Sequence, residues 1–229
     1  MTQVEAAFAV PASRLQLLIL LDRFTSVPEF EFHAADFASH PLMNSLLHSL
    51  LLDNSSTLST IGLTMLIKLL PIFAVKACEE LKVLLPRLLV ILARIICWEE
   101  RSSSVLQPPL LVDDGGRPGA ENQTDEFGGR AVPELRPNLG WERFQPTLTG
   151  PAPPSDAYFS RLYYLFPCNL LRFVRSPAEY LRDRKCDSPY TVSWEDTFDE
   201  DNIRSKSEVR TIMPFICSFV HGCVLIRTF

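Results

Sequence analysis

The sequence predicts an all-α protein whose helices are interrupted by one long segment without regular structure. Apolar residues make up 47% of the 229-residue chain, which is enough to bury a sizeable core. Leucine is abundant and only nine glycines occur, a composition that favours helix over sheet. Nine of the 18 prolines and seven of the nine glycines fall between positions 99 and 155. We therefore expect helical core at 13–98 and 156–221, an insert at 99–155, and a tail at 222–229.

The first two expected helices are bounded by capping residues and prolines. Ser13 belongs to a residue type that commonly caps helix N-termini, and Leu15 and Leu18 begin an apolar face at helical spacing. Pro28 marks the break that follows. Pro41 fits the first turn of a second helix, where its missing N–H has no partner in any case. The buried stripe of that helix comprises Leu42, Leu46, Leu47 and Leu50.

The turn-forming cluster Asp53-Asn54-Ser55-Ser56 separates the second helix from a third. We expect Pro71 to end the third helix, because the residue before a proline disfavours helical torsion angles. In the fourth helix, Pro86 lies either in the first turn or at a kink. The apolar faces of these two helices contain Leu58, Ile61, Met65 and Leu69, and then Leu84, Leu85, Leu88, Leu92, Ile95 and Ile96.

The fourth helix carries two arginines, Arg87 and Arg94, on one face, because they are seven residues apart. The favoured interpretation is a solvent-exposed stripe, and the alternative is a basic strip that faces a partner or lipid. Four helices joined by short breaks, each apolar over a wide face, indicate stacked helical hairpins. Because no repeat of fixed period is evident, a globular all-α bundle stays open as the alternative.

The insert at 99–155 contains runs that cannot continue a helix or a strand, such as Asp113-Asp114-Gly115-Gly116 and Pro151-Ala152-Pro153-Pro154. We expect a disordered or extended, flexible segment. Trp141 and Phe144 are its possible docking points on the core. A short linear motif is the alternative role.

Three short helices are expected after the insert. Ser155 caps the first, Pro167 opens the second, and Ser176-Pro177 begins the third. An acidic cluster follows at positions 195–201, which is typical of a solvated loop and lacks the ordered spacing and central glycine of an EF-hand. A further helix is expected to begin near Asn202.

Composition and motifs argue against several function classes. The formal net charge of −5 disfavours a dedicated nucleic-acid binder, which needs a basic face. His33, His40 and His48 lack the spacing of a zinc motif, and the chain contains no nucleophile elbow or phosphate-binding loop. The six cysteines form no CxxC pair and lie mostly in apolar runs, which favours a reducing compartment. We expect no enzymatic activity, cofactor or metal site.

Membrane insertion is also disfavoured. The apolar segments 61–77 and 81–98 each contain charged or helix-breaking residues, so we interpret both as helices buried in protein. The first ten residues lack the positive start of a signal peptide. The apolar stretch 211–226 is short for a membrane span, and a tail anchor there is the alternative.

The most specific pattern of the chain is the segment 158–175, YFSRLYYLFPCNLLRFVR. An aromatic-rich helix with an Arg-Leu-Tyr stretch leads through a Pro-Cys-Asn turn into a second helix with a Phe-x-Arg end. This pattern resembles the N-terminal core of hamartin, a subunit of the tuberous sclerosis complex, and the long insert resembles fungal members of that family. Segments 59–71 and 81–98 are similar to the two preceding helices. The signature comprises Arg161, Leu162, Tyr163, Pro167, Cys168, Asn169, Phe173 and Arg175.

The Pro-Cys-Asn turn is expected to be a structural corner. Pro167 opens the second helix, Asn169 hydrogen-bonds locally, and Cys168 packs inward. The resemblance supplies no catalytic residue for this corner.

The resemblance implies a HEAT-like α-solenoid that acts as a non-catalytic scaffold. In the family, hamartin stabilises tuberin, which carries GTPase-activating activity toward Rheb, and the pair restrains the TOR kinase. The resemblance also implies a cytoplasmic protein. Peripheral attachment to the lysosomal or vacuolar membrane and self-association are further expectations. A generic HEAT-like adaptor and a peripheral membrane protein with an unrelated partner are the alternatives.

Compared with the family, the chain lacks the first solenoid helices, the long middle region and the C-terminal coiled coil. Its last residues do not resemble the expected continuation. We therefore expect a truncated or mis-spliced gene model with an artificial tail at 222–229.

Overall fold

The computed structural model describes residues 2–98, 133–144 and 150–208 of the chain. Its elements are α-helices and short 3-10 helices, as predicted, and within the described residues the one extended pairing is an isolated antiparallel bridge between Leu135 and Tyr190. The bounds are α1 (Thr2–Phe8), η1 (Pro11–Ser13), α2 (Arg14–Phe24), η2 (Pro28–His33), α3 (Ala34–Ser39), α4 (Pro41–Leu52), α5 (Ser56–Lys76), α6 (Cys78–Ile96), η3 (Pro137–Leu139), α8 (Asp156–Leu165), α9 (Pro167–Arg175), α10 (Pro177–Asp183) and α11 (Trp194–Thr197). Residues 200–208 are also helical.

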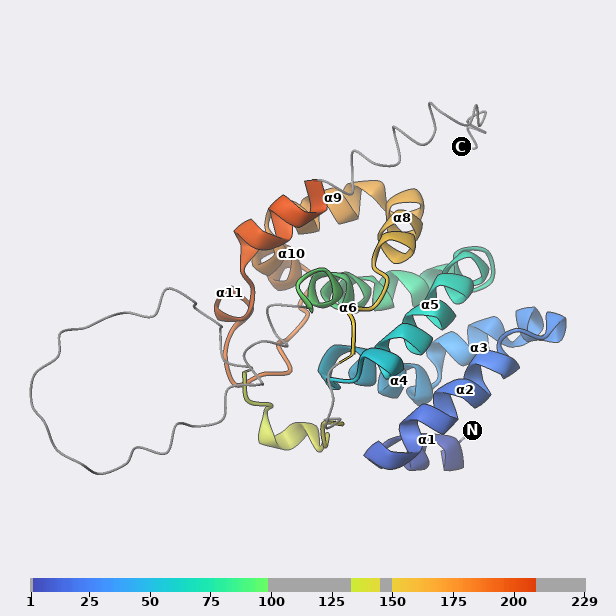
Figure 1. Cartoon of the computed structure of the whole chain (residues 1–229). Coiled ribbons are helices and arrows are strands. Elements are labelled where there is room, and N and C mark those ends of the chain that lie inside the picture. The colour runs from blue at the N-terminus through green and yellow to red at the C-terminus, as the bar shows by residue number, and fades with distance from the viewer. Residues whose placement is uncertain (1, 99–132, 145–149, 209–229) are drawn as a thin grey trace, which may run out of the picture.

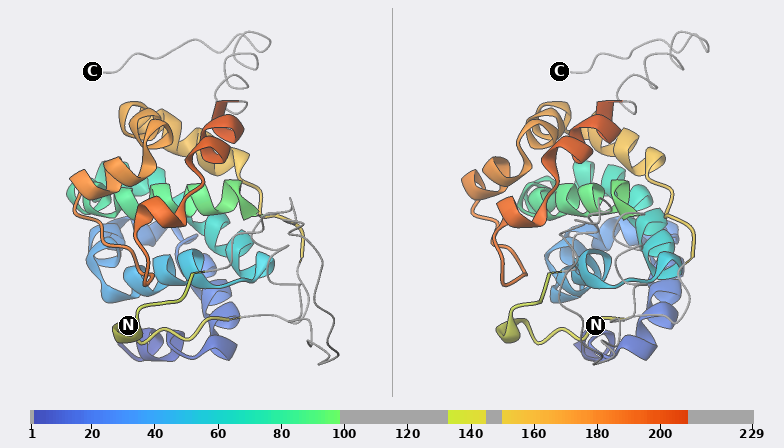
Figure 2. Two further views of the ribbon diagram at one scale, coloured as in Figure 1. Left: turned by 90° about the vertical axis from the view of Figure 1, so that its left-hand side faces the viewer. Right: turned by 60° about the vertical axis from the view of Figure 1, so that its left-hand side comes forward.

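The helices are stacked in layers along one direction of the molecule (Figure 1). The N-terminal helices α1 and α2 lie at one end, α3 to α6 form the middle, and α8 to α10 lie at the other end. The two rotated views of Figure 2 show the same order. This stacking of successive helices against their neighbours is the arrangement of a helical solenoid, and it agrees with the predicted stacked hairpins.

Most helices begin where the sequence predicts them. The imidazole Nδ1 of His40 accepts from the backbone N–H of Leu42 at the start of α4, and Ser55 Oγ accepts from Leu58 N–H at the start of α5. Pro41 opens α4, and Pro167 and Pro177 open α9 and α10. Ser13 and Ser155 occupy the predicted N-cap positions of α2 and α8, but neither side chain makes a capping hydrogen bond to the helix backbone. Local sequence signals therefore predict most of the helix starts.

Pro71 does not end the third predicted helix, and this prediction was wrong. Helix α5 continues through Pro71 to Lys76. Proline removes one backbone hydrogen bond from a helix interior, at a cost of about 3 kcal/mol. The apolar side chains around it, among them Leu69, Leu70 and Phe73, are almost fully buried. Since each buried side chain of this size contributes about 1.5–3 kcal/mol, packing outweighs the lost bond.

Pro86 also lies inside a helix, because α6 begins at Cys78, eight residues earlier. Of the two predicted alternatives, the first turn is therefore excluded. A single residue, Ala77, separates α5 from α6, and it leaves the helical region with φ −144° and ψ 48°. The two longest helices thus form one tight hairpin at the centre of the stack.

The core joins both halves of the chain around this central hairpin. Helix α4 crosses α5 closely at Gly62, where an added Cβ atom would lie 2.7 Å from Leu50 Cδ2. On the other side of the hairpin, the fully buried Tyr158 of α8 donates its hydroxyl hydrogen to the carbonyl oxygen of Leu88, at 3.0 Å. Burial raises the pKa of Tyr158 well above its ordinary value.

Helix α5 is long and apolar enough to cross a membrane, with a mean hydropathy of 2.0 over its most apolar window. Half of that window is buried inside the protein. Its charged residue Lys68 forms an ion pair with Asp22 of α2. These contacts support the interpretation of this segment as a core helix.

Candidate functional site

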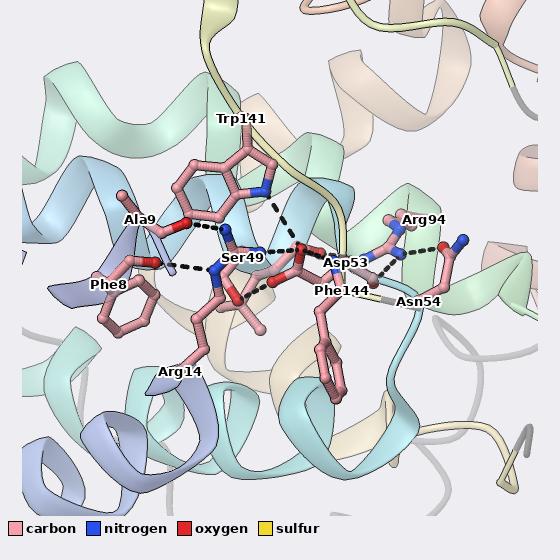
Figure 3. Close-up of polar contacts among 10 residues, drawn as sticks. Phe8, Ala9, Arg14, Ser49, Asp53, Asn54, Arg94, Trp141 and Phe144 are labelled. Carbon is pink, nitrogen blue, oxygen red and sulfur yellow. Dashed lines mark hydrogen bonds and ion pairs between the residues drawn. The ribbon is translucent and has the colours of Figure 1, made fainter. Parts of the chain in front are cut away.

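Asp53, the C-cap residue that follows α4, is the centre of a buried polar network (Figure 3). Its carboxylate is almost completely inaccessible to solvent. Oδ1 accepts from Arg14 Nη1 at 2.7 Å, and Oδ2 accepts from the hydroxyl of Ser49 at 2.6 Å. A buried charge of this kind is tolerated because it is paired and its lone pairs are hydrogen-bonded.

Arg14 extends the network to the N-terminus of the chain. Its Nε donates to the carbonyl oxygen of Phe8 at 2.8 Å, and Nη2 donates to that of Ala9 at 2.9 Å. These bonds satisfy the backbone at the end of α1, a helix that precedes the predicted core at 13–98. The fully buried guanidinium therefore holds α1 against the α4–α5 junction.

Residues 133–144, called the strap below, bring part of the insert onto this network. The indole Nε1 of Trp141 and the backbone N–H of Phe144 both donate to Asp53 Oδ1, at 3.2 and 2.9 Å. The backbone carbonyl oxygen of Phe144 in turn accepts from the backbone N–H of Asn54 at 2.9 Å. The Arg14 guanidinium lies 3.9 Å from the Trp141 ring centroid. The predicted docking of Trp141 and Phe144 is confirmed, and the insert residues 99–132 and 145–149 lie outside the described part.

The other end of the strap is fastened to the C-terminal half. The backbone N–H of Arg136 donates to the carbonyl oxygen of Pro189 at 3.0 Å, and its Nε donates to that of Tyr190 at 3.0 Å. Thr191 N–H donates to the Glu134 carbonyl oxygen at 2.9 Å. The strap therefore connects the α4–α5 junction to the loop between α10 and α11.

Arg94 belongs to the same network. It lies neither on a solvent-exposed stripe nor on a basic strip that faces a partner or lipid, so both predictions for this residue were wrong. Its side chain is buried and donates to the carbonyl oxygens of Leu50 and Asp53 and, at 3.1 Å, to Asn54 Oδ1. Arg87 does lie on the same face, is partly buried, and donates to Asn44 Oδ1 at 2.7 Å. This face of α6 therefore packs on α4, where Arg94 caps the carbonyl groups at the helix end.

The network is suited to holding segments together. Asp53 Oδ1 accepts three hydrogen bonds and Oδ2 accepts one, so the carboxylate has little capacity left for a substrate or a metal. Within the described residues, no group of three or more His, Cys, Asp or Glu side chains could hold a metal ion. The chemistry of the site is that of a structural junction.

The hamartin-like signature forms the corner between α8 and α9. Leu162 and Phe173 are fully buried, and Tyr163 stacks on Phe159 with ring centroids 6.4 Å apart. Pro167 is exposed at the first position of α9. Arg161 and Arg175 have exposed side chains.

Two details of this corner differ from expectation. Cys168 is exposed on the first turn of α9, so the prediction that it packs inward was wrong. Asn169 Oδ1 accepts from the Tyr180 hydroxyl and from Arg184, both at 3.0 Å, instead of bonding locally. Asn169 therefore ties α9 to α10 and to the turn that follows α10, and Cys168 faces outward because the next buried position of α9 is Leu170.

The acidic cluster at 195–201 is divided among surface contacts. Glu195 pairs with Arg182 at 3.1 Å, and Asp201 pairs with Arg204 at 3.0 Å. Glu200 accepts from the N–H of Ala178 at the start of α10. The prediction of a solvated loop is correct only in part, because Glu200 lies in the helical segment 200–208 and not in a loop.

The central residues of the site, Arg14 and Asp53, were not singled out from the sequence. Asp53 was recognised only as part of a turn cluster, and its main partner lies 39 residues away. The one available signal for this site was Arg14, a lone arginine directly before a leucine-rich run. It did not indicate which carboxylate it pairs with.

Comparison with known proteins identifies the fold. No family model and no curated protein matches the sequence. A solved structure described as the TSC1 N-terminal domain matches 91% of this chain, with 22% sequence identity and a TM-score of 0.57. The chain has the fold of the TSC1 N-terminal domain.

A second structure, described as the TSC1 N-terminal and linker domain, matches 96% of the chain with 21% identity and a TM-score of 0.54. The chain spans 44% and 55% of the lengths of these two structures. TSC1 is the hamartin subunit, so the matches support the hamartin-like N-terminal core at the level of the fold. They also support the predicted helical solenoid over a globular bundle.

Proposed function

We propose that this chain is the core of a non-catalytic scaffold subunit of the hamartin type. The observation that carries the proposal is the fold match to the TSC1 N-terminal domain over 91% of the chain. The signature of segment 158–175 supports it independently, because that resemblance rests on sequence. The buried polar network of Asp53 also suits a scaffold, since its charges are used to join segments.

The partner that this proposal implies is a tuberin-like GTPase-activating protein. The scaffold stabilises that partner and thereby restrains TOR signalling in the cytoplasm, with peripheral attachment to the lysosomal or vacuolar membrane. Partner and pathway rest on the hamartin resemblance. No cofactor takes part in such a role.

Affinity capture tests this function. The full-length protein is tagged at its own locus and captured from cell extract, with an untagged strain as the control. We expect a protein with a Rheb-type GTPase-activating domain at comparable abundance, and GTPase-activating activity in the captured fraction. Capture of an unrelated partner set without that domain would contradict the proposal and favour a generic HEAT-like adaptor.

A peripheral membrane protein with an unrelated partner is the second alternative. Flotation of the captured complex with liposomes tests it. Membrane association that persists after the GTPase-activating partner is removed genetically, together with unchanged TOR activity, would favour that alternative. Loss of TOR restraint in the same strain supports the scaffold.

A further inference from the structure

A pocket of about 220 Å³ lies where the strap meets the central hairpin and the loop that follows α10. Helices α4, α6 and α11 complete its wall. An apolar cavity of about 150 Å³ holds a benzene ring, so this pocket is large enough for a small organic molecule. It lies outside the buried Asp53 network and has no part in the scaffold function proposed above.

Two arginines line this pocket without a carboxylate partner. Arg87 makes one hydrogen bond, to Asn44 Oδ1, and Arg136 uses Nε for the Tyr190 carbonyl oxygen. Among the described residues, neither guanidinium forms an ion pair, and both keep N–H groups without an acceptor. Guanidinium groups with free N–H pairs bind oxyanions strongly, because they donate two parallel hydrogen bonds.

The charge of the pocket matches one negative charge. Asp187 contributes the one carboxylate of the wall and leaves a net charge of +1 from the two arginines. His48 also lines the pocket, and burial, followed by the charge of Arg87, lowers the pKa of its imidazole below 6.5. His48 is therefore neutral at pH 7, so a monoanion balances the pocket better than a dianion does.

The rest of the wall is mixed, because Asn138, Cys186 and Ser188 line it beside apolar side chains. Leu51 of α4, Val90 of α6 and Leu139 of the strap line it together with the indole of Trp194. The polar groups of such a pocket can orient a ligand, and its apolar side chains can cover part of the ligand's apolar body.

We propose that this pocket binds a small organic monocarboxylate, whose carboxylate contacts Arg87 and Arg136 and whose apolar body packs against Leu51, Val90 and Trp194. The ligand bridges the strap and α6, so binding fastens the insert to the central hairpin. Bound carboxylate therefore stabilises the folded chain, since a ligand that binds only the folded state shifts the unfolding equilibrium.

Calorimetric titration of the full chain with benzoate tests this proposal at pH 7.5. Two ligands of similar shape serve as controls, the neutral benzamide and the dianion phenyl phosphate. We expect saturable binding of benzoate that is at least about tenfold tighter than that of either control, because a charge-assisted hydrogen bond contributes more than a neutral one.

Matched variants locate the site. Arg87→Gln should weaken benzoate binding by about tenfold or more, as expected for loss of a charged donor. Asn44→Ala, which removes the one partner of Arg87 but keeps its charge, should leave binding within about threefold, because the charged donors that bind the carboxylate remain. Arg161→Gln changes an exposed arginine of α8 and should have no effect. A circular dichroism melt of each variant confirms that it is folded.

Absence of saturable benzoate binding would overturn the proposal. Equal binding of benzamide would overturn the role of the arginines, and tighter binding of phenyl phosphate would overturn the assignment of a monoanion. Equal weakening by Arg87→Gln and Arg161→Gln would show that the site lies elsewhere. Selective loss in Arg87→Gln supports the proposal.

Discussion

At the scale of single residues, the stability of the molecule depends on one buried carboxylate. Asp53→Ala leaves the Arg14 guanidinium buried without its counter-charge, and it removes the acceptor of Trp141 and Phe144. We expect the free energy of unfolding to fall by about 3–5 kcal/mol, as in other buried pairs that lose one partner. Urea denaturation followed by circular dichroism measures it.

The matched control for this change is Asp183→Ala. Asp183 pairs with Arg172 at the surface, where both side chains are about half exposed. Solvent screening limits such pairs to roughly 0–1 kcal/mol. Equal destabilisation by the two substitutions would contradict the central position of Asp53.

His48 gives the stability a pH dependence. Burial, and secondarily the charge of Arg87, lowers its pKa in the folded state below the ordinary value of 6.5. The unfolded chain therefore binds the proton at higher pH than the folded chain does, and stability rises with pH in that interval. As pH falls from 7.5 to about 5.5, through the ordinary pKa of histidine, we expect the free energy of unfolding to decrease.

Denaturant titrations at several pH values measure this decrease. His48→Gln removes the titrating group and should flatten the profile between those pH values. His33→Gln serves as the control, since it removes a histidine at the end of η2, away from the pocket. An identical pH profile for wild type and His48→Gln would contradict this assignment.

At the scale of elements, the strap is part of the fold. Trp141→Ala removes the indole hydrogen bond to Asp53, the contact with Arg14 and the edge contact with His48, whose ring centroid lies 5.6 Å from that of Trp141. The strap should then open locally more often. We expect the backbone amide of Asn54, which donates to Phe144, to exchange about tenfold faster, the factor that corresponds to 1.4 kcal/mol.

Hydrogen exchange followed by mass spectrometry measures this opening. Tyr164→Ala provides the control, because Tyr164 is an exposed aromatic residue of α8. Unchanged exchange at Asn54 in Trp141→Ala would show that Trp141 contributes little to holding the strap, and that the Phe144 hydrogen bonds and the contacts at residues 189–191 suffice.

The sequence predicts those elements whose signals are local. Pro41, Ser55 and Pro167 mark helix starts because the residues themselves favour capping and first-turn geometry. Pro71 gave a wrong helix end because the burial that stabilises α5 beyond this residue comes from contacts with other helices. Arg94 misled for the same reason, since the carbonyl groups it caps lie 41 to 44 residues earlier.

At the scale of the whole molecule, the fold is a stack of helices. The strap, which is part of the long insert, joins the α4–α5 junction to the loop between α10 and α11. Helices joined by short breaks indicate stacked hairpins and leave a globular bundle open, and the hamartin resemblance of segment 158–175 implies the solenoid. The Asp53 junction could not be predicted, because its members lie at positions 8–14, 49–54, 94 and 141–144 and meet only in the folded chain. A stack of this kind depends on its neighbour contacts, so such junctions determine how cooperatively it unfolds.

The central proposal is that the protein is a hamartin-type scaffold that stabilises a GTPase-activating partner. The most direct test is the half-life of the tuberin-like partner in cells after synthesis is blocked, with the full-length protein present or depleted. We predict that depletion shortens the half-life, that re-expression of wild type restores it, and that Asp53→Ala restores it poorly. A partner half-life that does not change on depletion would contradict the account.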